Sequence, residues 1–230
     1  MAEPEGRHAL VTGASSGIGA AIVTRLLADG WRVTGVSRSR PAATDLRHDH
    51  VALDLSDVDA IAPALAGRRT DALVHAAGLL RVGRLGAMAA EDGDAMWRLH
   101  VEAATRLADL LAPGMGPGGR IVLIGSRTAS GAAGRGAYAA SKAALVALAR
   151  SWAAELAPRG ITANVVAPAA TDTPMLADPS RVGVTPKLPP IGRFVRPEEV
   201  AAAVAFLMSR EADAITGQQL VICGGSSLAA

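Results

Sequence analysis

Short apolar runs alternate along the chain with longer stretches in which apolar residues recur every three or four positions. The short runs predict buried strands, and the longer stretches predict amphipathic helices. Strands are expected at residues 9–11, 32–36, 51–53, 71–76, 119–125, 161–167 and 220–222. Helices are expected at residues 17–29, 57–66, 91–111, 137–156 and 197–209.

Strands and helices that alternate in this way predict right-handed crossovers and a parallel sheet covered on both faces. Residues 37–50 are expected to hold at most one helical turn, and residues 174–190, with five prolines, to form a substrate loop. No linker or internal repeat divides the sequence. The prediction is one α/β domain over residues 1–230, a doubly wound Rossmann-type fold with a seven-stranded parallel sheet. Its ligand is expected at the carboxyl ends of the strands.

Composition narrows the class of protein. Half of the 230 residues are hydrophobic and 19% are charged, which excludes a disordered chain. The 23 basic and 21 acidic residues nearly cancel, and no basic run indicates nucleic acid as a partner. No stretch predicts a membrane span, and the strand near His8 leaves no room for a signal peptide. The single cysteine, Cys223, fits a reducing compartment, so we expect a cytoplasmic protein.

A glycine-rich segment, residues 12–19, joins the first predicted strand to the first helix. Glycine lets a backbone approach a ligand closely, and a helix N-terminus offers unpaired N–H groups to a pyrophosphate. The glycine spacing differs from G-x-G-x-x-G, and an ordinary tight turn is the alternative. The segment predicts a dinucleotide cradle formed by Gly13, Ser15, Ser16, Gly17, Ile18 and Gly19.

The end of the second strand predicts which dinucleotide is preferred. An acidic residue there binds ribose hydroxyls, whereas arginine suits a 2′-phosphate. Here Ser37 is followed by Arg38 and Arg40, which favours NADP(H) and leaves NAD(H) possible. Alternatively, both arginines are solvated. Asp54, after the third strand, accepts from an adenine amino group or caps the following helix.

The only tyrosine, Tyr138, stands four residues before Lys142, so the two side chains share a helix face. A neighbouring ammonium stabilises phenolate and lowers a tyrosine pKa that is otherwise near 10. Tyr138 can then exchange a proton with a carbonyl or alcohol oxygen. Ser126, at the end of the preceding strand, can polarise the same oxygen. The alternative is a surface tyrosine and lysine.

In these segments the sequence resembles the short-chain dehydrogenase/reductase family over nearly its whole length. The resemblance implies that Ser126 positions the substrate, Tyr138 is the acid/base, and Lys142 holds the nicotinamide ribose. It implies that Thr173 and the backbone at Thr171 hold the carboxamide. The motifs are residues 12–19, 75–78, 168–173, 193–199 and 216–219, with Ser126 and the Tyr138/Lys142 pair, and the resemblance adds Leu55, Ala77, Gly78, Pro168 and Ala169 to the cofactor site.

The family is commonly tetrameric or dimeric, so the resemblance implies a homotetramer or homodimer. The helices from Glu91 and from Ala137 would supply one interface, and the C-terminal strand region another. No metal is implied.

The sequence departs from the family at several positions. His100 stands where an asparagine usually starts a proton relay, and either relays protons itself or only fills space. His75 replaces another common asparagine and is expected to bond backbone. Ser126 is favoured over Ser130 as the catalytic serine. Cys223, where an aspartate is frequent, is expected to be buried and inert.

The substrate is expected over the nicotinamide. Arg81, Arg127 and Lys187 suggest a substrate carboxylate or phosphate, unless they face solvent. The stretch 73–83 is similar to dehydrogenases that aromatise dihydroxy-cyclohexadiene carboxylates. We therefore expect an NADP(H)-dependent oxidoreductase acting on a small carbonyl or alcohol. The alternatives are an NAD-linked cyclic dihydrodiol dehydrogenase, a nucleotide-binding regulator without turnover, and a redox-neutral elimination or epimerisation. Leu80, Met175 and Leu176 complete the expected walls.

Overall fold

The computed structural model describes residues 6–41, 45–177 and 186–228. Its seven strands form one parallel sheet in the order β3-β2-β1-β4-β5-β6-β7, as the doubly wound prediction requires. The strands are β1 (His8–Thr12), β2 (Arg32–Ser37), β3 (His48–Ala52), β4 (Ala72–His75), β5 (Arg120–Ile124), β6 (Thr162–Pro168) and β7 (Gln219–Ile222).

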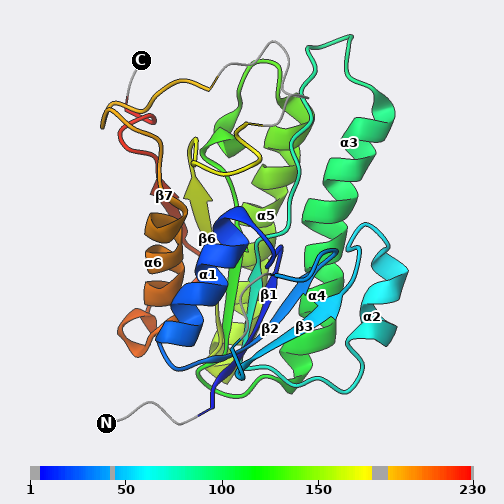
Figure 1. Ribbon diagram of the computed structural model, residues 1–230, viewed down its shortest axis with the longest axis vertical. Helices are drawn as coiled ribbons and strands as arrows, with labels where there is room; N and C mark the ends of the chain where they lie inside the picture. The colour runs from blue at the N-terminus through cyan, green and yellow to red at the C-terminus, as the bar shows by residue number, and fades with distance from the viewer. Residues whose placement is uncertain (1–5, 42–44, 178–185, 229–230) are drawn as a thin grey trace.

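Helices cover both faces of the sheet (Figure 1). On one face α1 and α6 pack together over one apolar cluster, and on the other α2, α4 and α5 pack over a second. The predicted layers are therefore confirmed. Within the described residues, no helix is both long and apolar enough to cross a membrane. The α-helices are α1 (Gly17–Ala28), α2 (Ile61–Ala64), α3 (Ala90–Trp97), α4 (Ala103–Leu111), α5 (Gly136–Leu156) and α6 (Pro197–Met208).

Two predicted elements differ in extent. Strand β3 begins at His48 instead of residue 51, because its backbone pairs with β2 at the sheet edge, where polar side chains remain partly exposed. The helix predicted at 57–66 is instead a 3-10 turn followed by the single turn of α2. Pro63 has no N–H for a longer helical ladder, and Gly67 follows with φ +73°.

The helix predicted at 91–111 is interrupted. Between α3 and α4 the chain forms a π-helical turn over Arg98–Glu102, where the Ala103 N–H bonds to the Arg98 carbonyl five residues back. Such turns are rare and frequently mark functional sites. The turn contains His100, whose side chain is fully buried.

The expected loop at residues 174–190 is described only in part, since residues 178–185 lie outside the described residues. Up to Ala177 and from Pro186 onward, its described residues hold turns and irregular backbone.

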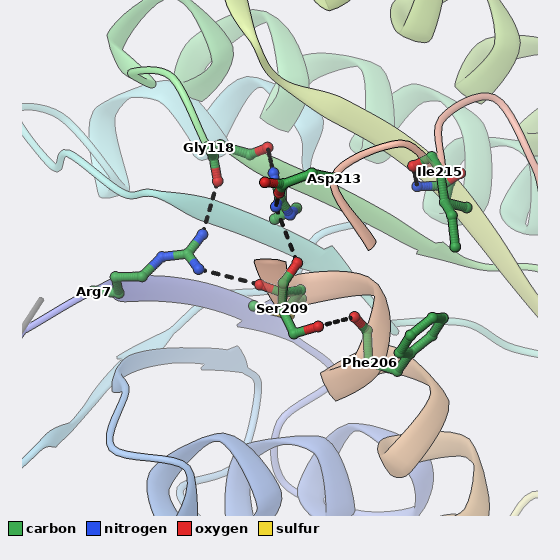
Figure 2. A network of polar contacts seen from close by, with 10 residues as sticks. Arg7, Gly118, Phe206, Ser209, Asp213 and Ile215 are labelled. Carbon is green, nitrogen blue, oxygen red and sulfur yellow. Dashed lines mark hydrogen bonds and ion pairs between the residues drawn. The ribbon is translucent and has the colours of Figure 1, made fainter. Parts of the chain in front are cut away.

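Arginine side chains tie the elements together at the amino ends of the strands (Figure 2). Arg7 donates to the Gly118 carbonyl at 2.8 Å, and the buried Arg120 donates to the Ser209 carbonyl at 3.0 Å and pairs with Asp213. These bonds join the start of β1, the turn before β5 and the segment after α6. The candidate site residues lie at the opposite, carboxyl ends of the strands.

Candidate active site

The glycine-rich segment after β1 folds as a tight cradle. A Cβ on Gly13 would lie 2.9 Å from the Ala77 nitrogen, and one on Gly19 would lie 2.1 Å from the Gly13 carbonyl oxygen. Gly13 and Gly17 have φ of +66° and +54°, conformations that side chains disfavour. Ser16 is the N-cap residue of α1, and its side chain makes no capping bond. The helix N-terminus therefore presents N–H groups that fit a pyrophosphate.

The segment after β6 lies against this cradle. A Cβ on Gly17 would be 3.2 Å from Thr173 Cγ2. Thr171 pairs with Val195 in an isolated bridge, and its hydroxyl donates to the Ala169 carbonyl at 3.0 Å. The structure thus brings Thr173, which is expected with the Thr171 backbone at the carboxamide, beside the glycine-rich segment.

The end of β2 presents guanidinium groups. Arg38 and Arg40 are exposed, whereas Ser37 is buried and its hydroxyl donates to the Ser39 carbonyl at 2.8 Å. His50 Nε2 lies 3.0 Å from the same hydroxyl. Because Ser37 already has internal partners, the arginines are the groups available to a 2′-phosphate.

The segment after β3 resolves one of the alternatives for Asp54. Its carboxylate accepts from the Ser56 N–H at 2.9 Å, while Asp57 caps the following 3-10 turn by accepting from Ala60. Asp54 is therefore not the side-chain cap of that turn, and it is exposed at the sheet's carboxyl edge. Leu55 beside it is buried in the apolar cluster of that face.

The catalytic candidates gather around the start of α5. Lys142 is buried, its Nζ donates to the Ile124 carbonyl at 2.8 Å, and it lies 5.9 Å from the centre of the Tyr138 ring. Burial lowers the pKa of Lys142 to about 7. The end of β5 therefore fixes the ammonium beside the only tyrosine.

Ser126 follows β5 and is buried, whereas Ser130 is exposed. The Ser126 hydroxyl oxygen accepts from the Thr128 N–H at 3.2 Å and lies 2.8 Å from the Thr128 hydroxyl. Ser126 is two residues from Ile124, the residue that holds Lys142. Of the two serines, Ser126 is therefore the one beside the residue that anchors Lys142, and its catalytic role stays a prediction.

Two buried histidines, His75 and His100, lie behind the candidate residues. The His100 ring meets the Tyr138 ring edge to face, with centroids 5.6 Å apart. A Cβ on Gly78 would lie 3.1 Å from His100 Nε2 and 3.5 Å from Lys142 Nζ. Gly78 therefore allows the loop after β4 to approach both groups.

Burial lowers the pKa of His75 to about 3 and that of His100 well below its ordinary value, and the nearby Lys142 ammonium adds to both effects. Both rings are therefore neutral at physiological pH. His75 Nε2 donates to the Leu99 carbonyl at 3.1 Å, so its predicted bond to backbone is confirmed.

The sequence reasoning missed Thr12 and Ser141. The Thr12 hydroxyl accepts from the Ala76 and Ala77 N–H groups, each at 3.0 Å, and so holds the loop after β4 to the end of β1. Ser141 lies between His100 and the Tyr138 carbonyl. A polar residue at the end of an apolar strand, and a serine directly before Lys142, were the available signals.

The expectation for Cys223 is wrong. Cys223 is partly exposed rather than buried, because it directly follows the exposed edge strand β7, and a hydrogen bond with Ser227 lowers the pKa of its thiol.

Two of the possible substrate-binding cations have partners within the chain. Arg81 Nε lies 3.4 Å from Asp92 Oδ1, and the Arg127 guanidinium donates a long 3.5 Å hydrogen bond to the Ser226 carbonyl. The described residues contain no cluster of ligands suited to a metal.

Comparison with known proteins agrees with the resemblance in sequence. Residues 13–227 match the family model described as enoyl-(acyl carrier protein) reductase. The chain is 38% identical over 239 residues to the 3-oxoacyl-(acyl-carrier-protein) reductase FabG of Salmonella typhimurium, which covers 96% of this chain and 97% of that protein. It is 36% identical over 250 residues to the 2,3-dihydro-2,3-dihydroxybenzoate dehydrogenase of Escherichia coli, covering 98% of each.

Solved structures share the fold across the whole domain. A short chain dehydrogenase family protein from Francisella tularensis superposes with a TM-score of 0.88 at 26% identity, over 97% of this chain and 99% of that one. BdcA in complex with NADPH superposes with a TM-score of 0.83 at 35% identity, over 95% and 93%. Sequence, sheet order and these relatives together show that the chain belongs to the short-chain dehydrogenase/reductase family.

Proposed function

We propose that the protein is an NADP(H)-dependent oxidoreductase that transfers hydride between a nicotinamide ring and a carbonyl or alcohol, with Tyr138 as general acid and base. The observation that carries the proposal is the buried Lys142 ammonium held beside the Tyr138 ring at the carboxyl edge of the sheet. An ammonium there stabilises phenolate, so the phenol becomes a more effective proton donor to an alkoxide forming on the substrate.

The other groups have distinct tasks in this proposal. We assign Thr128 as the donor in its pair with Ser126, which leaves the Ser126 hydrogen for the substrate oxygen. Tyr138 then gives its proton to that oxygen in reduction and recovers it in oxidation. The bound dinucleotide supplies or accepts the hydride. Lys142 holds its ribose, and in its protonated form, which its pKa of about 7 keeps populated at neutral pH, it places positive charge near the phenol.

The cofactor assignment rests on this chain's own residues and on its relatives. The cradle from Gly13 to Gly19 fits a pyrophosphate, and Ala77 and Thr173 lie against it at Gly13 and Gly17. Exposed Arg38 and Arg40, without an acid at the end of β2, favour a 2′-phosphate. The structural relative BdcA was crystallised in complex with NADPH. NAD(H) is the less favoured alternative.

A second candidate function is oxidation of a cyclic dihydrodiol with NAD. It is supported by the Escherichia coli relative named for that chemistry. Because Arg81 pairs with Asp92, Arg127, one residue after Ser126, is the cation that would bind the carboxylate of such a substrate. A regulator that binds nucleotide without turnover lacks support of this kind, since Ser126, Tyr138 and Lys142 are all present.

The test is a panel of ketones, aldehydes and 3-oxoacyl thioesters with NADPH and NADH, and of cyclic diols with NADP and NAD, monitored by nicotinamide absorbance. The proposal expects stoichiometric cofactor consumption, faster with the phosphorylated cofactor, and its loss in Tyr138→Phe. Faster oxidation of cyclic diols with NAD supports the second candidate. Tight NADPH binding with no turnover across the panel contradicts both.

We also propose a homotetramer or homodimer in the cytoplasm. Support comes from the exposed apolar strand β7, where Leu220 and Val221 are 40% and 41% exposed, and from Trp97 on α3, which is 45% exposed. The single cysteine supports a reducing compartment. Light scattering of the purified protein measures the oligomer directly, and a monomeric mass would refute that part.

A further inference from the structure

Both ring nitrogens of His100 are bonded. The Leu79 N–H donates to Nε2 at 3.1 Å, so this nitrogen is an acceptor without a proton. Nδ1 lies 2.9 Å from the Ser141 hydroxyl, and the Ser141 hydroxyl donates to the Tyr138 carbonyl at 2.9 Å. Nδ1 therefore carries the proton and donates to Ser141. His100 links the loop after β4 to the first turns of α5.

His75 has the opposite tautomer. Its Nε2 lies 3.1 Å from the Leu99 carbonyl, which can only accept, so Nε2 carries the proton. Its Nδ1 lies 3.0 Å from the Thr12 hydroxyl, which already accepts two N–H groups and has one hydrogen left to donate. His75 therefore links the end of β1 to the π-helical turn.

The bond to Leu99 bears on the shape of that turn. In a regular α-helix the Leu99 carbonyl would accept from Ala103, but the Ala103 N–H bonds to Arg98 instead. The Nε2–H of His75 donates to the Leu99 carbonyl in place of the Ala103 N–H. The π-helical turn in turn places His100 between Leu79 and Ser141. The two imidazoles thus form consecutive links: His75 joins the end of β1 to the π-helical turn, and His100, in that turn, joins the loop after β4 to α5, the helix that carries Tyr138.

We propose that His75 and His100 are positioning residues, two neutral hydrogen-bond bridges with fixed and opposite tautomers that set the π-helical turn, the Leu79 loop and the Tyr138 turn relative to one another. Neither passes protons during turnover. Through Leu79, His100 acts on the loop that carries Ala77 and Gly78, which the proposed function assigns to the cofactor, and through Ser141 it acts on Tyr138. The proposal rests on the proposed oxidoreductase function for its kinetic consequences, but its structural part does not.

Amide side chains separate the two bonds of His100. In His100→Asn the amide nitrogen replaces Nδ1 and keeps the donor to Ser141, but the bond from Leu79 is lost. In His100→Gln the amide oxygen replaces Nε2 and keeps Leu79, but the bond to Ser141 is lost. We expect His100→Asn mainly to raise the NADPH Kd, and His100→Gln mainly to lower kcat, each by about tenfold, the size expected for one buried hydrogen bond.

The pH dependence of kcat distinguishes positioning from proton transfer. For positioning, the apparent pKa values in the profile stay the same in wild type and in both variants. A relay through the imidazole predicts instead that both variants lose kcat equally and that the profile shifts. Either of those results overturns the proposal.

Ser141→Ala tests the link to Tyr138 without touching the imidazole, and it serves if a histidine variant fails to fold. It should lower kcat about as much as His100→Gln, and the double variant should be no slower than either single one. Additive losses would contradict a shared link. His8→Asn is the matched control, because the His8 ring bonds the Arg69 carbonyl and the Thr34 hydroxyl in the amino half of the sheet. It should leave kcat and the NADPH Kd unchanged.

The structural part is tested by amide hydrogen exchange on the protein without cofactor. His75→Gln keeps the donor to Leu99, whereas His75→Asn keeps only the acceptor toward Thr12. Exchange over Arg98–Glu102 should be at least about fivefold faster in His75→Asn than in His75→Gln, since only the former frees the turn. Equal exchange would overturn the role of His75. This result is independent of turnover, so an inactive wild type would count against the proposed function and not against the bridges.

Discussion

Lys142 Nζ lies 5.9 Å from the centre of the Tyr138 ring while it donates a 2.8 Å hydrogen bond to the Ile124 carbonyl. The lysine is therefore anchored to the end of β5, and the tyrosine belongs to the first turn of α5. Because a strand end and a helix set the separation, the charge that tunes the phenol is held by backbone geometry. A lysine side chain is long and flexible, so the burial of Lys142 is needed to keep its ammonium at this position.

Tyr138→Phe tests the proton-transfer role directly. Removing the hydroxyl should lower kcat by about a hundredfold to ten-thousandfold, the usual contribution of a general acid or base. The NADPH Kd should change little, because the ring and Lys142 remain. Steady-state rates and a fluorescence titration of NADPH measure the two effects. Retained turnover would show that another group supplies the proton.

The pKa of Lys142, lowered to about 7 by burial, predicts how stability depends on pH. Between pH 7 and about 10, the folded lysine is largely neutral while the unfolded one is still protonated, so the unfolded state binds more protons. Stability of the cofactor-free protein should therefore rise with pH over this range. The increase in unfolding free energy that this group produces over the range is of the order of 4 kcal/mol.

Lys142→Met removes the titrating group, so the rise over that range should become much smaller. Urea unfolding at several pH values in wild type and variant measures the difference. Wild type that gains no stability relative to the variant between pH 7 and 9 would contradict the lowered lysine pKa.

Arg38→Asp should move cofactor preference from NADP toward NAD. The guanidinium is exposed at the end of β2, where an aspartate would repel a 2′-phosphate and accept from ribose hydroxyls. We expect the ratio of kcat/KM for the two cofactors to change by at least about tenfold. Arg32→Asp makes the same charge change at the opposite end of the same strand and should leave the ratio unaltered. Equal effects of both substitutions would remove Arg38 from cofactor recognition.

The sequence predicted the sheet, both helical layers and the residues of the catalytic helix because these depend on strong periodicity or on rare residues such as the only tyrosine. The π-helical turn at Arg98–Glu102 was missed because a change of hydrogen-bond spacing over five residues hardly alters an apolar pattern. Thr12 resembles any strand threonine until β1 and β4 are side by side. The contact between the Ser37 hydroxyl and His50 depends likewise on the pairing of β2 with β3.

Gly19→Ala tests whether the cradle requires close backbone contact. A methyl group there would lie 2.1 Å from the Gly13 carbonyl oxygen, and backbone cannot withdraw as a flexible side chain can. We expect a loss of at least about 3 kcal/mol in unfolding free energy, together with loss of NADPH binding, because the loop must open to relieve the overlap.

Gly116→Ala is the matched control, since a Cβ at that position meets no atom within 4 Å. Thermal unfolding and NADPH titration of the two variants separate the close contact from the general effect of losing a glycine. If Gly19→Ala melted and bound cofactor as Gly116→Ala does, residues 12–19 would be an ordinary turn. The turn would then have room to spare, and the pyrophosphate would have to be held by other backbone at the carboxyl edge of the sheet.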